Sequence, residues 1–471
     1  MKKVIIVLLV LIAVTAIGLP PVIGGMTESS VRAHIAQMDE NPMFAMQVSD
    51  YERGWFSSQA QVRIAFDERY LELAAADAGD IAAGADQGIT VPVRIAHGPV
   101  VVTDGLYFGM SRIYAVLGDS DPLVAMATQE LGLDHLAELS GQVSYFGTFD
   151  FTGSMPPIEY IGETGQISFS GLHLDGTARG PDLQLDGRME DLAMDAAGTA
   201  VTIENLDVAS DSTRINQLLW AGEFDGGIES MTIVDTLAGA DGAIELTGLQ
   251  LDGRVDLDDT GELFDASASY TAESVRLPGE DMLLSDAELG IGITNLSVEA
   301  LTEYYETAMD IDPRNPAPAA ILLPGIGARL LAANPAVSID PIRFTLDGSS
   351  LNAAISLRTV NGDQSDIDLS NPMMLLGMFE ASARIAASKP LFEMLAGQAA
   401  AAQLGAVDPA QLPPNQDIES LAAGQASVMI ISLLGQGYLV DDGENYSTEI
   451  EYANGEVLIN GMPLPLGALL Q

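Results

Sequence analysis

Cysteine is absent from this chain of 471 residues, which excludes disulfides, thiolate metal sites and cysteine nucleophiles. Lysine is almost absent too, because it occurs only as Lys2, Lys3 and Lys389. Aromatic residues make up 6% of the chain and hydrophobic residues 48%, so the core must be built mainly from aliphatic side chains. This composition indicates a folded chain that holds together without covalent cross-links.

Positive charge is scarce, since 19 Lys and Arg residues stand against 67 Asp and Glu residues and give a formal net charge of -48. Such a field repels nucleic acid and anionic lipid headgroups, so neither is expected as a partner. In a salt-rich medium the self-repulsion of the chain is screened at short range. We interpret the acidic excess as a solvated surface adapted to a saline environment.

Signatures of catalysis are also missing, because the sequence has no Walker loop, G-x-S-x-G elbow or dinucleotide fingerprint. Four histidines occur, and they do not form a recognised metal-binding spacing: His34, His97, His135 and His173. His97, which precedes Gly98 and Pro99, lies at a break in the apolar alternation, and a packed turn histidine is the favoured reading there. We expect no enzyme, no metal and no cofactor.

One acidic turn resembles the first half of a calcium loop, with Asp256, Asp258, Thr260 and Gly261 at the required spacing. Ser267 stands where the closing bidentate Glu is needed, and acidic turns arise by chance in so acidic a chain. Calcium is therefore not expected at this turn.

Residues 4–25 carry no charge and follow two lysines. A run of about 22 such residues is long enough to cross the hydrocarbon core of a bilayer, roughly 30 Å, as a helix. Because the positive residues precede the run, residues 1–25 should form a cytoplasmic stub and anchor in a bacterial inner membrane, with residues 26–471 in the periplasm. The alternative is a cleaved signal peptide, for which residues 14–16 offer a poor site.

Period-two alternation of apolar residues predicts strands through most of the remaining chain. An α+β fold dominated by β is expected, with a large antiparallel sheet and helices packed against it. Two turns are expected, the first at Arg53, Gly54, Trp55 and Phe56 and the second at Asn454 and Gly455, a strong hairpin signal. Helical patterns are expected at residues 27–40, 122–139, 299–334 and 372–435, and the ectodomain divides by pattern into 26–160, 161–298 and 299–471.

Four segments in the middle of the chain share a near-repeat, in which the parity of the apolar positions changes at a Gly or an Asn followed by Leu. A strand can change the parity of its buried face only through an extra residue, and Gly and Asn tolerate positive φ. We predict β-bulges at Gly171, Asn205, Gly248 and Asn295. Because bulged strands coil, the sheet should be curved with a concave apolar face; a flat, half-buried sheet in which these residues mark turns is the alternative.

Three motifs near the ends of the chain are similar to those of a known family. They are Arg53, Gly54, Trp55 and Phe56; His97, Gly98 and Pro99; and the C-terminal hairpin with Asn454 and Gly455. These motifs resemble the YdgA family of bacterial envelope proteins of unknown function, in the same order along nearly the whole chain. The resemblance implies inner-membrane anchoring and a periplasmic body, and it implies no catalytic residue. The acidic, lysine-poor composition departs from the family.

Three functions are open at this point. The first is a non-enzymatic periplasmic protein that binds lipid or another apolar envelope component in a β-groove. The second is an envelope scaffold without a ligand groove, whose exposed loops, such as residues 53–56, bind a partner protein. The third is an envelope hydrolase that uses His97 with a nearby carboxylate. No ligand-binding residue can be named from the sequence.

Overall fold

The computed structural model describes most of the chain between residues 44 and 464, together with Gly25, Glu28, Ser29 and Arg32. The described ranges are 44–66, 88–102, 105–162, 165–196, 198–216, 218–235, 242–277, 282–310, 317–360, 377–405 and 418–464. The chain divides into two compact units, which we call unit 1 (Met1–Glu229 with Ala308–Pro318) and unit 2 (Ser230–Thr307 with Ala319–Gln471). The finer division expected at residues 160 and 298 stays a prediction.

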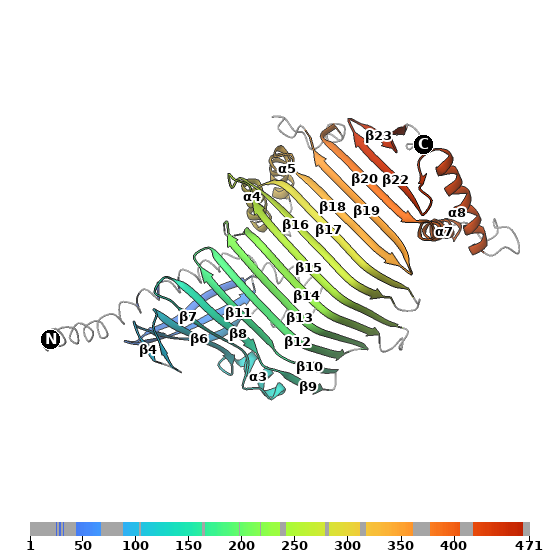
Figure 1. The fold of residues 1–471 in the computed structure, drawn as a ribbon. Helices are drawn as coiled ribbons and strands as arrows, with labels where there is room; N and C mark the ends of the chain where they lie inside the picture. The colour runs from blue at the N-terminus through green and yellow to red at the C-terminus, as the bar shows by residue number, and fades with distance from the viewer. Residues whose placement is uncertain are drawn as a thin grey trace, which may run out of the picture. The chain divides into compact units, whose positions relative to one another are not determined.

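Unit 1 is an antiparallel meander, in which most strands pair with the strand that precedes them in the chain (Figure 1). Its main ladder runs in the order β1 (Phe44–Arg53), β2 (Ser57–Phe66), β3 (Ile89–His97), β6 (Ser111–Gly118), β7 (His135–Val143), β8 (Thr148–Met155), β11 (Leu172–Arg179), β12 (Asp182–Ala196) and β13 (Thr199–Arg214). The hairpin of β9 (Ile158–Gly162) and β10 (Gly165–Phe169) pairs with the second half of β12, and β4 (Val101–Val102) pairs separately with β5 (Leu106–Tyr107). β14 (Trp220–Asp235) runs from unit 1 into unit 2.

The helix expected at residues 122–139 is shorter than its pattern indicated. Helix α3 (Pro122–Leu131) begins at Asp121, whose carboxylate accepts hydrogen bonds from the backbone N–H groups of Leu123 and Val124. It ends at Gly132, which adopts φ 68 and caps the last turn. Residues from His135 onward form β7 instead, because pairing with β6 and β8 outweighs the local helical pattern.

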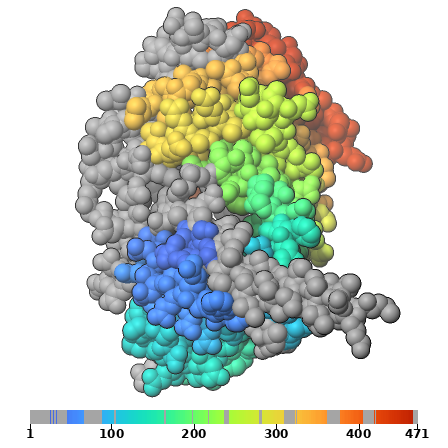
Figure 2. Space-filling model, turned by 90° about the vertical axis from the view of Figure 1, so that its left-hand side faces the viewer, coloured from blue at the N-terminus to red at the C-terminus, as the bar shows by residue number. Residues whose placement is uncertain are grey.

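Unit 2 contains a second antiparallel meander, whose green, yellow and orange strands lie side by side in Figure 1; the same segments are neighbours in the space-filling view of Figure 2. The strands pair in the order β15 (Ala243–Leu257), β16 (Leu263–Arg276), β17 (Leu283–Ser297), β18 (Ala336–Leu346), β19 (Ser349–Thr359), β20 (Phe379–Ser388), β22 (Asn445–Ala453), β23 (Glu456–Ile459) and β24 (Met462–Leu464). The short β21 (Val440–Asp441) also pairs with β22. Asn454 and Gly455 join β22 to β23 with φ 54 and φ 79, the two positive values that a type I′ turn requires, which confirms this predicted hairpin.

The helices of the second half confirm one prediction and correct another. Two helices, α4 (Val298–Asp310) and α5 (Ala317–Ala332), occupy the region where two were expected. The block at residues 372–435 contains α7 (Lys389–Gly405) and α8 (Ile418–Gly435), but it also contains a strand, β20. Alanine-rich β20 has good helix propensity, and pairing with β19 on one side and β22 on the other overrides it.

The four predicted bulge residues all adopt positive φ, at 106 for Gly171, 50 for Asn205, 61 for Gly248 and 57 for Asn295. Only at Asn295 does the ladder slip: Phe264 pairs with Leu296 but Ala266 pairs with Ile293, so two residues of β17 oppose one of β16. The other three positions show no inserted residue in their ladders with β12 or β16, which keep a single register on both sides of the positive-φ residue.

In unit 1 the strands keep their pairing register because neighbouring strands interrupt the alternation of apolar and polar residues at positions that lie opposite one another. Apolar residues pair across the strands on one side of these positions (Met155, Leu172, Met189, Leu206) and again on the other side (Ile158, Phe169, Leu192, Ile203), three positions away in every strand. We call the residues between these rows the break line; they are residues 156–157, 170–171, 190–191 and 204–205. Since every strand changes parity together, we infer that the apolar face continues across the line.

The fold is therefore dominated by antiparallel β-structure with a few helices, as expected. Within the described residues no helix is long and apolar enough to cross a membrane. The predicted anchor at residues 4–25 lies outside those residues except for Gly25. Of the helix expected at residues 27–40, only Glu28, Ser29 and Arg32 are described, and they are helical.

Candidate functional site

The sheet of unit 2 is amphipathic, with apolar and polar rows alternating across its strands. One apolar row joins Val255, Ala266, Ile293, Val337, Leu357, Ala381 and Tyr452 through successive pairings. The next row joins Arg254, Ser267, Gly292, Ser338, Ser356, Ser382 and Glu451. Because successive side chains of a strand point to opposite faces, the first row lies on an apolar face and the second on a polar face.

The apolar face of unit 2 is not fully covered. Six large side chains on it are each exposed by 36% or more: Leu257, Tyr270, Leu289, Val337, Ile355 and Leu357. They come from five neighbouring strands, β15 to β19, and share one face of the sheet. Extended exposure of this kind is unusual for a soluble chain and marks surfaces that meet an apolar partner.

The polar face of the same sheet carries cross-strand ion pairs. Arg276 contacts Glu245 at 2.9 Å, Arg343 contacts Glu288 at 2.9 Å, and Arg384 contacts Glu449 at 2.8 Å. Arg358 also pairs with Glu380. These exposed pairs contribute little stability individually, but they show that this face is the solvated one.

Helices α7 and α8 cover one end of the apolar face, where α7 packs on β19, β20 and β22. The ring of Phe392 on α7 meets the ring of Tyr446 on β22 edge to face, with centroids 5.4 Å apart. Between the two helices and Tyr446 lies a cavity of about 620 Å³, which we call the hairpin cavity. Its wall is formed mainly by small and apolar residues, including Met394, Gly397, Ala401, Ala422, Ala426 and Ile430. Its volume falls within the range of small-molecule sites.

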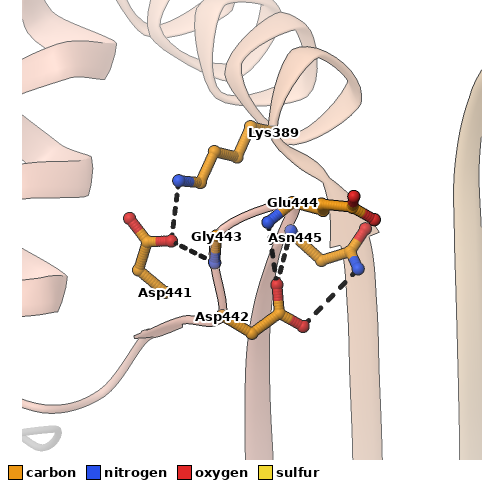
Figure 3. A network of polar contacts seen from close by, with 6 residues as sticks. All are labelled: Lys389, Asp441, Asp442, Gly443, Glu444 and Asn445. Atoms are coloured by element: carbon orange, nitrogen blue, oxygen red, sulfur yellow. Dashed lines mark hydrogen bonds and ion pairs between the residues drawn. The ribbon is translucent and has the colours of Figure 1, made fainter.

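A polar network fixes the start of α7 to the loop that precedes β22 (Figure 3). Lys389 Nζ lies 2.6 Å from Asp441 Oδ1, which also accepts a hydrogen bond from the Gly443 N–H at 2.8 Å. The Asp442 carboxylate accepts from the N–H groups of Glu444 and Asn445. The hydrogen bond to Lys389 lowers the pKa of Asp441, and the same bond raises the pKa of Lys389.

His97 lies in a second, buried polar arrangement in unit 1. Its Nε2 is 3.1 Å from the Ser58 hydroxyl oxygen, and the two residues are only 1% and 2% exposed. They belong to adjacent strands on the apolar side of the sheet, next to buried Ile95 and Ala60. A substrate would have to displace the packed core to reach this pair, so the geometry favours a structural histidine.

A polar hollow of about 430 Å³ lies on the other face of unit 1. Several of its side chains bond to one another: the Thr152 hydroxyl donates to Asp175 at 3.0 Å and the Thr177 hydroxyl donates to Asp150 at 2.9 Å. Gln184 donates to Asp211, just beyond the hollow, at 2.9 Å. Since these polar groups are already paired, the hollow offers less to a ligand than the apolar face of unit 2 does.

Of the other predicted motif residues, some are exposed to solvent and the rest take part in turns or backbone hydrogen bonds. Trp55 and Phe56, in the turn between β1 and β2, are exposed by 54% and 55%, while Arg53 ends β1. Gly98 follows His97 and donates its N–H to the Met110 carbonyl at 3.1 Å, and the Pro99 carbonyl accepts from the Tyr145 hydroxyl. Asn454 and Gly455 form a hairpin turn and serve the fold.

The rejected calcium turn satisfies its own polar groups. The Asp258 carboxylate accepts from the Thr260 hydroxyl at 2.7 Å and from the N–H groups of Glu262 and Leu263. These hydrogen bonds, with that of Thr260 the largest contribution, lower the pKa of Asp258.

Two features of the site could not be found by motif searching. The apolar face depends on which strands pair. The hairpin cavity depends on the contact between α7 and Tyr446, which lie more than 40 residues apart in the sequence. One signal was present in the sequence, because Lys389 is the single lysine after Lys3. A cation kept in an acidic, lysine-poor chain indicates a specific partner, here Asp441.

Comparison with known proteins agrees with the sequence motifs. Residues 1–467 match the model of a family described as "Bacterial protein of unknown function (DUF945)". Protein YdgA of Escherichia coli (strain K12) is 24% identical over 271 residues, an alignment that covers 55% of this chain and 51% of that protein. The alignment thus spans about half the length of this relative. No solved structure matches the chain. The chain belongs to the DUF945 family of bacterial proteins, whose function is unknown.

Proposed function

We propose that this chain is a membrane-anchored, non-enzymatic protein of the bacterial envelope that binds the acyl chains of lipids along the apolar face of unit 2. Residues 4–25 would hold it in the inner membrane with its body in the periplasm. The observation that carries the proposal is the set of six exposed apolar side chains that share one face of five adjacent strands.

An acyl chain suits this surface better than a compact ligand does. The exposed residues extend across strands spaced about 4.8 Å apart, so together they form a long and shallow track. The hairpin cavity lies at one end of the same face, where Tyr446 contributes to both. The net charge of -48 favours lipids with zwitterionic or neutral headgroups over anionic ones.

The test uses the alternation of β19, in which neighbouring residues face opposite sides. A photoreactive side chain is placed at Ile355 or Leu357 on the apolar face, and at Ser356 as the matched control on the polar face. After irradiation of the full chain in its native membranes, lipid adducts identified by mass spectrometry are expected at positions 355 and 357 and not at 356. Equal labelling at all three positions, or no adduct at any, contradicts the proposal.

A second test removes the apolar character without disturbing the core. Leu357→Asp, at a position that is 42% exposed, should reduce the lipid that copurifies with the full chain several-fold while unfolding remains cooperative. Ser356→Asp is the control and should retain lipid. Loss of lipid in both variants would mean that charge alone, and not the face, is responsible.

The two other functions give different results in the same experiments. A scaffold would yield one dominant protein adduct from the apolar face and no lipid. A hydrolase that uses His97 would lose activity in His97→Gln, but the 1% exposure of His97 and its pairing with Ser58 weigh against access by a substrate.

A further inference from the structure

One end of the unit 1 sheet carries large apolar side chains on its connecting loops. The exposed residues are Trp55 at 54%, Phe56 at 55%, Leu106 at 63%, Phe108 at 62%, Tyr145 at 49% and Phe146 at 88%. We call this set the aromatic rim. Its members come from three connections, between β1 and β2, between β3 and β6, and between β7 and β8.

The three connections lie next to one another at the same end of the sheet. The strands involved are successive neighbours in the sheet: β2, β3, β6, β7 and β8. Each connection begins or ends near the pair His97 and Ser111, at the same end of these strands. Backbone bonds join them, since the His97 N–H donates to the Phe56 carbonyl at 2.9 Å and the Met110 N–H donates to the Val143 carbonyl at 2.8 Å. The Tyr145 hydroxyl also donates to the Pro99 carbonyl. The rim is therefore one surface.

Acidic residues are sparse at the rim of this acidic chain. Residues 54–56, 98–110 and 144–147 contain one charged residue in the sequence, Asp104. Elsewhere Asp and Glu occur at about one position in seven, since there are 67 in 471 residues. A surface meant only for water would not lose its charge and gain aromatic residues together.

The rim lies beside the end of the segment expected to cross the membrane. A Cβ placed on Gly25, the last residue of that segment, would lie 3.1 Å from Arg53 Nη1, so Gly25 is adjacent to the Arg53 side chain. Arg53 also contacts Glu28 at 3.9 Å, and the Arg32 guanidinium lies over the Tyr51 ring at 5.5 Å from its centre. Both Tyr51 and Arg53 are at the rim end of β1. Gly25 thus lies beside the end of β1, which is followed within three residues by Trp55 and Phe56.

We propose that the aromatic rim inserts into the interfacial region of a zwitterionic lipid bilayer. Trp and Tyr are enriched at membrane–water interfaces, and Phe and Leu bury their side chains about 5–10 Å deep at the headgroup boundary. The rim holds unit 1 against the bilayer surface in addition to the anchor. This inference deepens the proposed anchoring and rests on it, because the position of Gly25 has this meaning only if residues 4–25 cross the membrane.

The chain provides its own reporter, because Trp55 and Trp220 are its two tryptophans. In Trp220→Phe the fluorescence of the full chain comes from Trp55 in the rim. In Trp55→Phe it comes from Trp220, which is 40% exposed and lies in none of the three connections. Both variants are reconstituted in phosphatidylcholine vesicles that contain either plain or brominated lipid.

Brominated lipid should quench Trp55 at least about threefold more than Trp220, with shallow bromines more effective than deep ones. Adding Phe108→Ser and Phe146→Ser, at two exposed positions, should reduce this quenching of Trp55. Equal quenching of Trp55 and Trp220 overturns the inference, as does shielding of Trp55 from aqueous iodide without quenching by lipid, which would identify a protein partner. If the chain floats with the vesicles but Trp55 is not quenched, only the rim inference fails; if the chain does not float, the proposed anchoring fails with it.

Discussion

Asn205 in unit 1 and Asn295 in unit 2 are the same kind of residue with a similar backbone conformation, and they have different effects on strand pairing. In unit 1, Asn205 adopts φ 50, and β12 and β13 keep one register on both sides of it. In unit 2, Asn295 adopts φ 57, and the ladder between β16 and β17 slips by one residue there. The local conformation is the same, so the difference lies in the neighbouring strand.

Asn205 faces the Glu190 level of β12, where the alternation of that strand also breaks, as it does at Gly171 and at residues 156–157. Asn295 faces Asp265, in the middle of regular pairing on β16. Where both paired strands break their alternation at the same point, the pairing register is preserved. Where only one strand breaks its alternation, the extra residue forms a bulge. A positive-φ residue therefore predicts a change of parity, and only the partner strand decides the register.

Deleting one residue from each strand should separate the two cases most strongly. Deletion of Asn295 removes the extra residue, so Leu296 can still pair with Phe264 on the regular register, and the cost should be about 1 kcal/mol or less. Deletion of Asn205 forces half of β13 out of phase with β12 and should cost about 4 kcal/mol or more. Urea unfolding of both variants measures the difference. Similar losses of stability would refute the distinction drawn between the break line and the bulge.

Gly171 tests whether the break line tolerates a side chain. Its φ is 106, and a Cβ there would lie 2.9 Å from the Met155 carbonyl oxygen. Gly171→Val should therefore lower the free energy of unfolding by about 3 kcal/mol. Gly180→Val is the control, because Gly180 also has positive φ, 61, but open space around it, and it should cost about 1–2 kcal/mol. Equal costs would mean that crowding at the break line is unimportant.

Replacing each asparagine by glycine should sharpen the comparison with a smaller effect. Asn295→Gly relieves the cost of positive φ and should stabilise the chain by about 0.5 kcal/mol. Asn205→Gly also loses the hydrogen bond from the Asn205 amide to Glu229, so its net effect should be close to zero. Thermal unfolding of the two variants is the measurement. A larger gain at position 205 than at 295 would show that this hydrogen bond contributes nothing.

The smallest effect is expected from pH, and it concerns unit 2 alone. The pKa of Asp441 lies below its ordinary value of 3.8, so its ion pair with Lys389 stabilises the start of α7 above that pH and is lost as the pH falls through the lowered pKa. The pKa of Lys389 lies above 10.5, so the pair persists until the pH rises through that raised value. The protection factor for hydrogen exchange in the first turn of α7 should be constant between these limits and should fall as the pH falls through the lowered pKa of Asp441. Lys389→Gln should abolish this acid response; an unchanged response would assign it to another group.

Local patterns were sufficient to predict much of the fold. Alternation predicted the long strands, the Gly and Asn positions predicted positive φ, and Asn454 with Gly455 predicted the last hairpin, because each depends on residues close in sequence. The end of α3 and the strand β20 were not predicted, since pairing with distant strands overrode their helical propensity.

The candidate site was less accessible to sequence reasoning for the same reason. The pairing of Ser58 with His97 joins residues on two strands, and the apolar face of unit 2 is formed only when five strands align their exposed residues. The exposed turn with Trp55 and Phe56 was expected, but its position next to the β3–β6 and β7–β8 connections was not, because that position depends on which strands pair. The alternation of apolar residues indicated an apolar face, and the pairing of strands located it.

The meander has a consequence for how the chain acquires its structure. From β15 to β20 each strand pairs with the one made just before it, so every new strand finds its partner already in place. Contacts between sequence neighbours form quickly, because little loop entropy is lost in closing them. Folding of unit 2 can thus proceed strand by strand as the polypeptide emerges, and β22 must wait until α7 and α8 have followed β20. The slow step should be the return of the helical hairpin, not the growth of the sheet.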